Sequence, residues 1–438
     1  MSIPQRLASG IDELRNFYVG KDINDVPKPA AILDVATARR HCASMLAAAR
    51  ALDVGDTLDP ANLVVSTLAE LAHLLPLLAQ YRAARRPFSV LYGVPLPPSQ
   101  AARLASLARD LGPGAVAVLV DHPAQLPAVA RFAQLAGSPA RVFLKVDTGY
   151  RRAGVPPDAL NKGGLLARVV AMEGAGRAVL AGVYSHSSLS YRDTTAAQAM
   201  ESLAGEIGGC VDALERHAAL LGGREVVVSV GASPQVTSIE NFAGTVAGEA
   251  GATAGLREAL RSVKAGLAGG SLRTKLELHA GVYAVLDMQQ LATNARTCLG
   301  GVEDEVALSV VAEVVSVYND GERETPEALV AVGSLGLGRE PCPSYRGWGV
   351  VGRGSYGSTS GEQPQSRLIV DRISQEHAIV GWEDGSIPIP LEVGQTVRIY
   401  PNHACVTGAM YGWYLVVDSS NPQSKSEIVD VWVRAAGW

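Results

Sequence analysis

Residues 116–121 read VAVLVD, an unbroken apolar run that predicts a β-strand buried on both faces. A second run of this kind, EVVVSV, occupies residues 225–230. From about residue 60 to residue 285, short β-rich runs alternate with Ala- and Leu-rich stretches whose apolar residues have helical spacing. This repeated β–α order predicts a parallel sheet with helices on its outside.

The alternating region contains seven strand-like runs, one fewer than the eight strands of a closed (β/α) barrel. After about residue 290 the pattern changes to strands that turn-rich segments separate, without long helices between them. The chain is therefore expected to combine an α/β part with a mostly β part. The seven runs are Leu63–Thr67, Phe88–Gly93, Ala115–Asp121, Val142–Asp147, Val179–His186, Val226–Gly231 and Lys275–Ala280.

The composition favours a soluble, folded protein in a reducing compartment. Hydrophobic residues make up 47% of the 438 residues and the formal net charge is −5, which argues against a nucleic-acid coat or an anionic-membrane binder. No apolar stretch reaches the roughly 18 residues that a membrane span needs. The five cysteines are an odd number at wide spacings, and no secretory signal precedes them, so we expect a cytoplasmic protein without a disulfide framework.

The segment KVDTGYRRAGV (145–155) follows a predicted strand, at the edge of the sheet where barrel enzymes place their sites. We expect Lys145, Asp147 and Arg152 to form a charge network that fixes this loop. Taken alone, the segment is equally compatible with a functional site and with a salt-bridged turn between a strand and a helix.

Two further strand ends carry groups suited to ligand binding. YSHSSLSY (184–191) offers the flat ring of His186 and several hydroxyl donors, although a lone histidine is more often a satisfied core residue. SVGASPQVT (229–237) ends in a small-residue turn whose backbone N–H groups suit a phosphate. The same turn is also typical of an ordinary helix start, with Ser233 as N-cap and Pro234 at the first helical position. The two interpretations are compatible.

PNHACVT (401–407) contains a histidine and a cysteine two residues apart. On an extended strand, His403 and Cys405 would face the same side. Imidazole plus thiolate suits Zn²⁺, and two protein ligands would leave an open site that water or substrate completes. On this motif alone, an unmetallated histidine and a buried cysteine are the simpler interpretation.

Together and in this order, the motifs resemble the eukaryotic-type D-serine dehydratases, which are pyridoxal-phosphate (PLP) enzymes of the alanine-racemase-like, fold type III group. The similarity runs from about Pro27 to the C-terminus, and PNHAC combined with KVDTGY is its most specific part. It implies a PLP-binding barrel over residues 30–290. It also implies a β domain over residues 291–438, with the N-terminal segment 1–36, that carries the metal site.

The resemblance implies the conversion of D-serine to pyruvate and ammonia. In the family, a lysine holds PLP as a Schiff base and removes the α-proton, and zinc polarises the departing β-hydroxyl. Mapped onto this chain, the zinc ligands are His403 and Cys405. The phosphate turn is Gly231, Ala232 and Ser233, where the family usually has Thr in place of Ser233. The residues that would line the cofactor are Tyr150, His186 and Tyr191.

The basic segment that carries the PLP lysine in the family, HVKTHK-like at the end of the first barrel strand, has no counterpart here. The helix at about 37–52 leads through DVGDTLDPAN directly into LVVSTLAE. A deletion near Gly55 would account for both the missing strand and the missing lysine, so we expect a TIM-type barrel without its first strand. Lys145 is the only lysine at the carboxyl end of a predicted strand, and we expect a structural role for it, with substitution for the missing PLP lysine as the less favoured alternative. The lysines stand at positions 21, 28, 145, 162, 264, 275 and 425.

The sequence leaves three functions open. The first is PLP- and zinc-dependent elimination from D-serine. The second is a PLP- and zinc-binding paralogue or truncated isoform without activity, which the missing lysine favours. The third is a D-threonine aldolase-like lyase, which is less favoured because aldolases present a carboxylate where Cys405 stands. The expected partners are a small D-amino acid and a second copy of the chain, and not nucleic acid or membrane.

Overall fold

The computed structural model describes residues 10–54, 60–243, 250–357, 366–385 and 387–438. The chain forms two compact units. The β-barrel unit comprises the residues up to Met45 together with Gly281–Arg434. The half-barrel unit comprises Leu46–Ala280 together with Ala435–Trp438.

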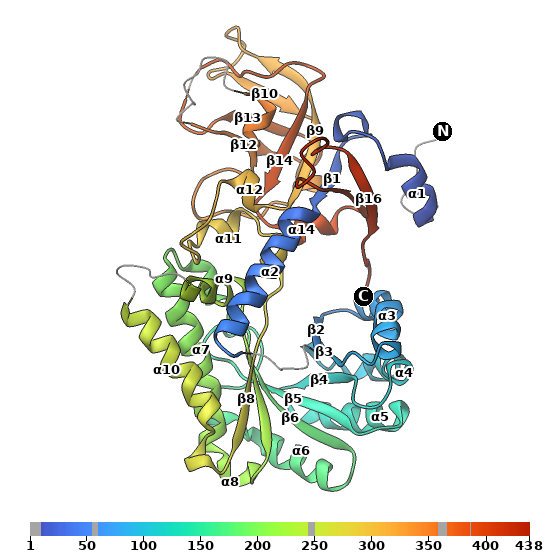
Figure 1. The fold of residues 1–438 in the computed structure, drawn as a ribbon, viewed down its shortest axis with the longest axis vertical. Coiled ribbons are helices and arrows are strands. Elements are labelled where there is room, and N and C mark those ends of the chain that lie inside the picture. Colours follow the sequence, from blue (N-terminus) through green and yellow to red (C-terminus); the bar gives the residue numbers. More distant parts are fainter. Residues whose placement is uncertain (1–9, 55–59, 244–249, 358–365, 386) are drawn as a thin grey trace. The chain divides into compact units, whose positions relative to one another are not determined.

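Parallel strands form the sheet of the half-barrel unit, in the order β2-β3-β4-β5-β6-β7-β8 (Figure 1). The seven runs expected from the sequence are confirmed, because each overlaps one of these strands and differs from it by at most two residues at either end. The strands are β2 (Ala61–Val65), β3 (Phe88–Pro95), β4 (Val116–Val120), β5 (Ala140–Lys145), β6 (Ala178–Tyr184), β7 (Glu225–Val230) and β8 (Arg273–Leu278).

The interior of the half-barrel is apolar. β4 is buried along its whole length, as the VAVLVD run predicts for a strand with both faces covered. Side chains that alternate along neighbouring strands meet in one core cluster, which fixes the curvature and the register of the sheet. The cluster comprises Leu91, Ala117, Leu119, Phe143, Ala181 and Tyr184.

Helices follow the strands of this unit, with apolar residues at helical spacing. In α4, the buried residues Ala101, Leu104, Ala105 and Ala108 lie on one face. That face packs inward because its residues recur every three or four positions. The helices are α3 (Leu68–Ala83), α4 (Ala101–Leu111), α5 (Leu126–Ala136), α6 (Leu165–Gly174), α7 (Ala196–Arg216), α8 (Ala218–Leu221), α9 (Ser233–Thr237) and α10 (Ala250–Ala265). The helix α2 (Val35–Ala51) is divided between the units, and its residues up to Met45 belong to the β-barrel unit.

The sheet of the half-barrel unit is open. Within the described residues, no backbone pairing joins β2 to β8, the two strands at its edges. A side-chain hydrogen bond spans these edges, from Asn62 Nδ2 on β2 to Glu277 Oε2 on β8, over 3.2 Å. In a closed eight-stranded barrel, the first strand would lie between the eighth and the second. The position of the opening therefore agrees with the absence of the first strand. Residues 55–59, where the deletion is predicted, lie outside the described residues.

The β-barrel unit contains a nine-stranded sheet, which confirms the mostly β part expected from the sequence. Because β10 pairs with both β13 and β9, the strands β9-β14-β11-β12-β13-β10 close into a six-stranded antiparallel barrel. β1, β15 and β16 extend the sheet from β9. The strands are β1 (Ala30–Asp34), β9 (Leu308–Tyr318), β10 (Glu327–Val330), β11 (Gly349–Val351), β12 (Leu368–Ile373), β13 (Ala378–Trp382), β14 (Thr396–Pro401), β15 (Trp413–Val417) and β16 (Ile428–Val433).

Short helices complete the β-barrel unit. In the described part of the chain, no helix combines the length and hydropathy that a membrane crossing requires. All five cysteines lie among the described residues, and none of them forms a disulfide. The helices are α1 (Ile11–Tyr18), α11 (Met288–Ala292), α12 (Val302–Glu305), α13 (Ser334–Leu337) and α14 (Ala404–Ala409).

Candidate active site

Lys145 and Tyr184 lie side by side at the carboxyl edge of the parallel sheet. β5 ends at Lys145, β6 ends at Tyr184, and the two residues are partners in the strand register. The Lys145 ammonium lies 4.6 Å from the centroid of the Tyr184 ring, and the lysine is only 4% exposed. Because active sites of barrel enzymes lie at this edge, the pair marks a candidate site.

The buried amine of Lys145 is poised to lose its proton. Burial lowers its pKa from 10.5 to about 8, because desolvation disfavours the charged form. The charge of Glu206 acts in the opposite direction, whereas that of Arg152 adds to the lowering of the pKa. The amine is therefore partly neutral near physiological pH, which an exposed lysine is not.

Glu206 on α7 was missed in the sequence analysis. It is 2% exposed, and burial raises the pKa of its carboxyl. Gln235 Nε2 donates a hydrogen bond to Glu206 Oε2, while Glu206 Oε1 has no partner among the described residues. The signal in the sequence was its position on the apolar face of the helix, together with Leu203 and Cys210.

Three aromatic rings stack behind the lysine. The rings of Tyr184 and His279 lie parallel, with centroids 4.3 Å apart and planes at 5°. The rings of His186 and His279 follow at 5.8 Å and 13°. Burial lowers the pKa of His186 to about 4, and the nearby charges of Arg152 and Lys145 lower it further. Burial likewise lowers the pKa of His279 well below 6.5, so both imidazoles are neutral at pH 7.

Ser229 connects His279 to the edge of the sheet. Ser229 Oγ lies 3.1 Å from His279 Nδ1 and donates to Glu277 Oε1 over 2.9 Å. Glu277 is the residue that also accepts from Asn62 across the open edge. His279 Nε2 is buried and has no hydrogen-bond partner among the described residues. A buried polar atom without a partner indicates a place for a polar group of a ligand.

The turn after β7 packs closely against the backbone of His279. Gly231 has φ +147°, and a Cβ placed there would lie 2.1 Å from the carbonyl oxygen of His279. Ala232 is the N-cap of α9 and Ser233 is its first residue. The predicted N-cap, Ser233, was therefore wrong by one residue. Ala232 and Ser233 are both buried. Backbone N–H groups at such a turn suit a phosphate, and a side chain on Gly231 would force the turn away from His279.

The loop after β5 is fixed differently from the way the sequence indicated. Asp147 Oδ1 accepts hydrogen bonds from the backbone N–H groups of Gly149 and Arg151, both over 2.9 Å. Asp147 thus fixes the loop through backbone hydrogen bonds, while the charges of Arg152 and Asp147 both act on Lys145. Tyr150 is 37% exposed, on the outside of this loop, with the Arg152 guanidinium 5.4 Å from its ring centroid.

The residues expected to line the cofactor are thus brought together only in part. His186 joins the stack that leads to the phosphate turn. Tyr191 is half-buried in the 3₁₀ segment Ser188–Arg192, which follows β6. Among the described residues, no ring contact joins Tyr150 to the stack, so its role stays a prediction.

His403 and Cys405 lie in the β-barrel unit, and the prediction that both stand on an extended strand was wrong. β14 ends at Pro401, His403 is the N-cap of α14, and Cys405 lies in the first turn of that helix. His403 is half-buried and Cys405 is exposed, so the cysteine is also not the buried residue of the simpler interpretation. Within the described residues, no group of three or more His, Cys, Asp or Glu side chains could hold a metal ion.

A buried carboxylate, Asp287, fixes the start of the helix that carries Cys405. Asp287 is 1% exposed, and its Oδ2 accepts from the backbone N–H of Ala404 over 2.9 Å. Its Oδ1 accepts from the N–H of Gln290 at the start of α11, also over 2.9 Å. Burial raises the pKa of Asp287 to about 6. The donor pair His403–Cys405 therefore stands on a helix start that a second segment of the chain holds in place.

Two sequence families match the chain. The alanine racemase N-terminal domain matches residues 36–247, and the putative serine dehydratase domain matches residues 307–417. D-serine dehydratase of Schizosaccharomyces pombe is 29% identical over 98% of this chain and 96% of its own. D-threo-3-hydroxyaspartate dehydratase of Delftia sp. HT23 is 28% identical over 86% of this chain and 84% of its own.

The solved structure of the Delftia enzyme has the same fold. It superposes with a TM-score of 0.69 at 25% identity, covering 95% of this chain and all of that one. A D-threo-3-hydroxyaspartate dehydratase with a histidine replaced by alanine has a similar structure, with a TM-score of 0.69 at 25% identity. A further D-threo-3-hydroxyaspartate dehydratase structure, in a metal-free form, has alanine in place of a cysteine that stands two positions after that histidine.

Proposed function

Because the chain belongs to the D-serine dehydratase group of the alanine-racemase-like, fold type III PLP family, we propose that it converts D-serine to pyruvate and ammonia. PLP and zinc are the proposed cofactors. The observation that carries the proposal is the turn at Gly231, which packs against the backbone of His279 and ends a strand in N–H groups of the kind that suit a phosphate. Beside it lies the unpartnered His279 Nε2.

The residues of the half-barrel fit a bound PLP. Gly231, Ala232 and Ser233 would hold the phosphate through backbone N–H groups and the Ser233 hydroxyl. The neutral rings of His186 and His279 present flat faces and nitrogen atoms without placing a cation next to the pyridine ring. Bound PLP supplies an electron sink for the charge that develops on the substrate when its α-proton leaves.

The residues of the β-barrel unit fit zinc as an open two-ligand site. Imidazole and thiolate are the donor types that zinc prefers, and His403 makes no capping hydrogen bond that would occupy its ring. The histidine and cysteine replaced in the D-threo-3-hydroxyaspartate dehydratase structures have the same spacing. Bound zinc supplies a Lewis acid for the β-hydroxyl, which is the poor leaving group of this reaction.

Water loss from a D-β-hydroxy amino acid is the activity to test first. We expect the purified chain, loaded with PLP and zinc, to release pyruvate from D-serine and not from L-serine. Pyruvate is measured by coupling to lactate dehydrogenase, and PLP binding is measured separately by equilibrium dialysis. Tight PLP binding without pyruvate release would support the second function, a binding paralogue, which the missing lysine segment favours. Absence of PLP binding would overturn the proposal.

The assembly and location of the protein are part of the same proposal. We expect a homodimer, as the family resemblance implies, and light scattering of the purified chain tests it. Free thiols at all five cysteines would agree with the proposed cytoplasmic location, and a thiol titration under denaturing conditions measures them.

A further inference from the structure

We propose that Lys145 is the amine through which this chain holds the aldehyde carbon of PLP. The inference rests on the PLP binding proposed above and adds the residue that forms the covalent bond. It replaces the structural role expected from the sequence. The reason is that the structure gives Lys145 a set of properties that no other lysine of the chain shares.

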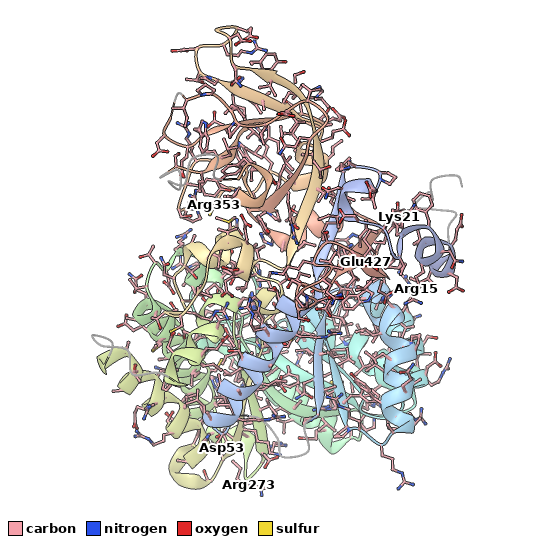
Figure 2. All side chains as sticks on the ribbon, turned by 45° about the horizontal axis from the view of Figure 1, so that its top comes forward. Arg15, Lys21, Asp53, Arg273, Arg353 and Glu427 are labelled. Carbon is pink, nitrogen blue, oxygen red and sulfur yellow. The ribbon has the colours of Figure 1, made fainter. Side chains whose placement is uncertain are left out.

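Burial separates Lys145 from the other six lysines. All seven lie in the described part of the chain, and Lys145 is the only one that is buried. Lys264 is exposed and donates to Asp53 over 3.1 Å, and Lys21 lies half-buried on the ring of Phe17 (Lys21 and Asp53 are labelled in Figure 2). An amine that must be partly neutral to react needs the desolvation that only Lys145 has.

Contacts lead without a break from Lys145 to the phosphate turn. The ammonium lies over the ring of Tyr184, and Tyr184 stacks on His279. The backbone of His279 lies against Gly231, the position at which a Cβ would meet its carbonyl oxygen. A PLP molecule whose phosphate binds at Gly231 therefore has its ring in the region of this stack, at the strand end that carries the amine.

Charges of both signs act on the Lys145 amine, so that it is held neither fully protonated nor fully neutral. Glu206 and Cys210 face it from α7, and Asp147 and Arg152 face it from the loop after β5. With a pKa of about 8, about one molecule in ten carries the neutral amine at pH 7. An exposed lysine is neutral in fewer than about one in a thousand. In the described structure no ion pair involves Lys145, so its amine can turn toward a carbonyl group.

The covalent step is a condensation that needs no further reactant. The lone pair of Lys145 Nζ adds to the aldehyde carbon and forms a carbon–nitrogen bond. The neutral amine loses its two N–H protons, both of which end on the carbonyl oxygen, and that oxygen leaves as water. One C=N bond replaces one C=O bond, and nothing is oxidised or reduced.

Peptide mapping after reduction tests the inference. The chain is mixed with one equivalent of PLP near the pKa of the amine, treated with borohydride and digested, and the peptides are identified by mass spectrometry. Borohydride turns the C=N bond into a stable amine, so we expect the reduced pyridoxyl phosphate group on the peptide that contains Lys145. Lys145→Arg keeps the charge and the contact with Tyr184 but cannot condense, and we expect it to lose this label. Lys275→Arg, at an exposed lysine, is the matched control and should keep the label.

The outcomes separate this inference from the proposed function. PLP that binds in dialysis but is trapped at another lysine, or at none, overturns the role of Lys145 and leaves the binding proposal intact. A chain that binds no PLP overturns both. If Lys145→Arg does not fold, as circular dichroism would show, the map of the unaltered chain still decides the question.

Discussion

Gly231 is the residue at which the smallest change should have the largest effect on cofactor binding. In Gly231→Ala, the new Cβ would lie 2.1 Å from the His279 carbonyl at a φ of +147°, so the turn must move. We expect the Kd for PLP to rise roughly 100-fold, equivalent to about 2.7 kcal/mol. Equilibrium dialysis measures it, with Gly255→Ala as control because its Cβ meets open space. PLP binding by Gly231→Ala that equals that of the unaltered chain would remove the phosphate turn from the site.

The buried amine of Lys145 also makes stability depend on pH. Its pKa is about 8 in the folded chain and about 10.5 when it is solvated, so the unfolded state binds more protons between these values. The penalty for burying the charge is therefore present below pH 8 and is lost as the pH rises toward 10.5. Lys145→Met has no such penalty. We expect its stability advantage over the unaltered chain to shrink by about 2–3 kcal/mol between pH 7 and 10.5. Urea unfolding of the PLP-free chains at both pH values measures it, and a constant difference would contradict the lowered pKa.

Among the elements, β2 and β8 are the weak points of the half-barrel. Their edges are joined by the side-chain bond between Asn62 and Glu277, and not by a ladder of backbone bonds. We expect Asn62→Ala to cost about 1 kcal/mol, the usual net value of one hydrogen bond, and Asn62→Asp to cost more because it sets a second carboxylate beside Glu277. Hydrogen exchange should then rise in β2 and β8 and not in β4. The control is Glu258→Ala, which removes an exposed ion pair with Arg261. Equal exchange in all strands would contradict an open edge.

The elements could be predicted where the signal is local. Apolar runs such as VAVLVD predict the strands of the half-barrel, because a strand that is buried on both faces needs apolar side chains at consecutive positions. The closure of six C-terminal strands into a barrel depends on the pairing of β10 with β9 and β13, which no local pattern records. The helix start at His403 was missed for a related reason. It is held by Asp287, which is far away in the sequence.

For the molecule as a whole, the residues proposed for PLP and those proposed for zinc belong to different compact units. Loss of the metal should therefore leave the cofactor in place. We expect Cys405→Ala to lose most of its zinc and its pyruvate release while it binds PLP as tightly as before. Metal analysis, the pyruvate assay and dialysis measure the three quantities. Cys298→Ala, which changes another exposed cysteine outside the proposed site, should leave all three unchanged. If PLP binding fell together with zinc, the cofactor sites would be thermodynamically linked. Unchanged zinc would show that Cys405 is not a ligand.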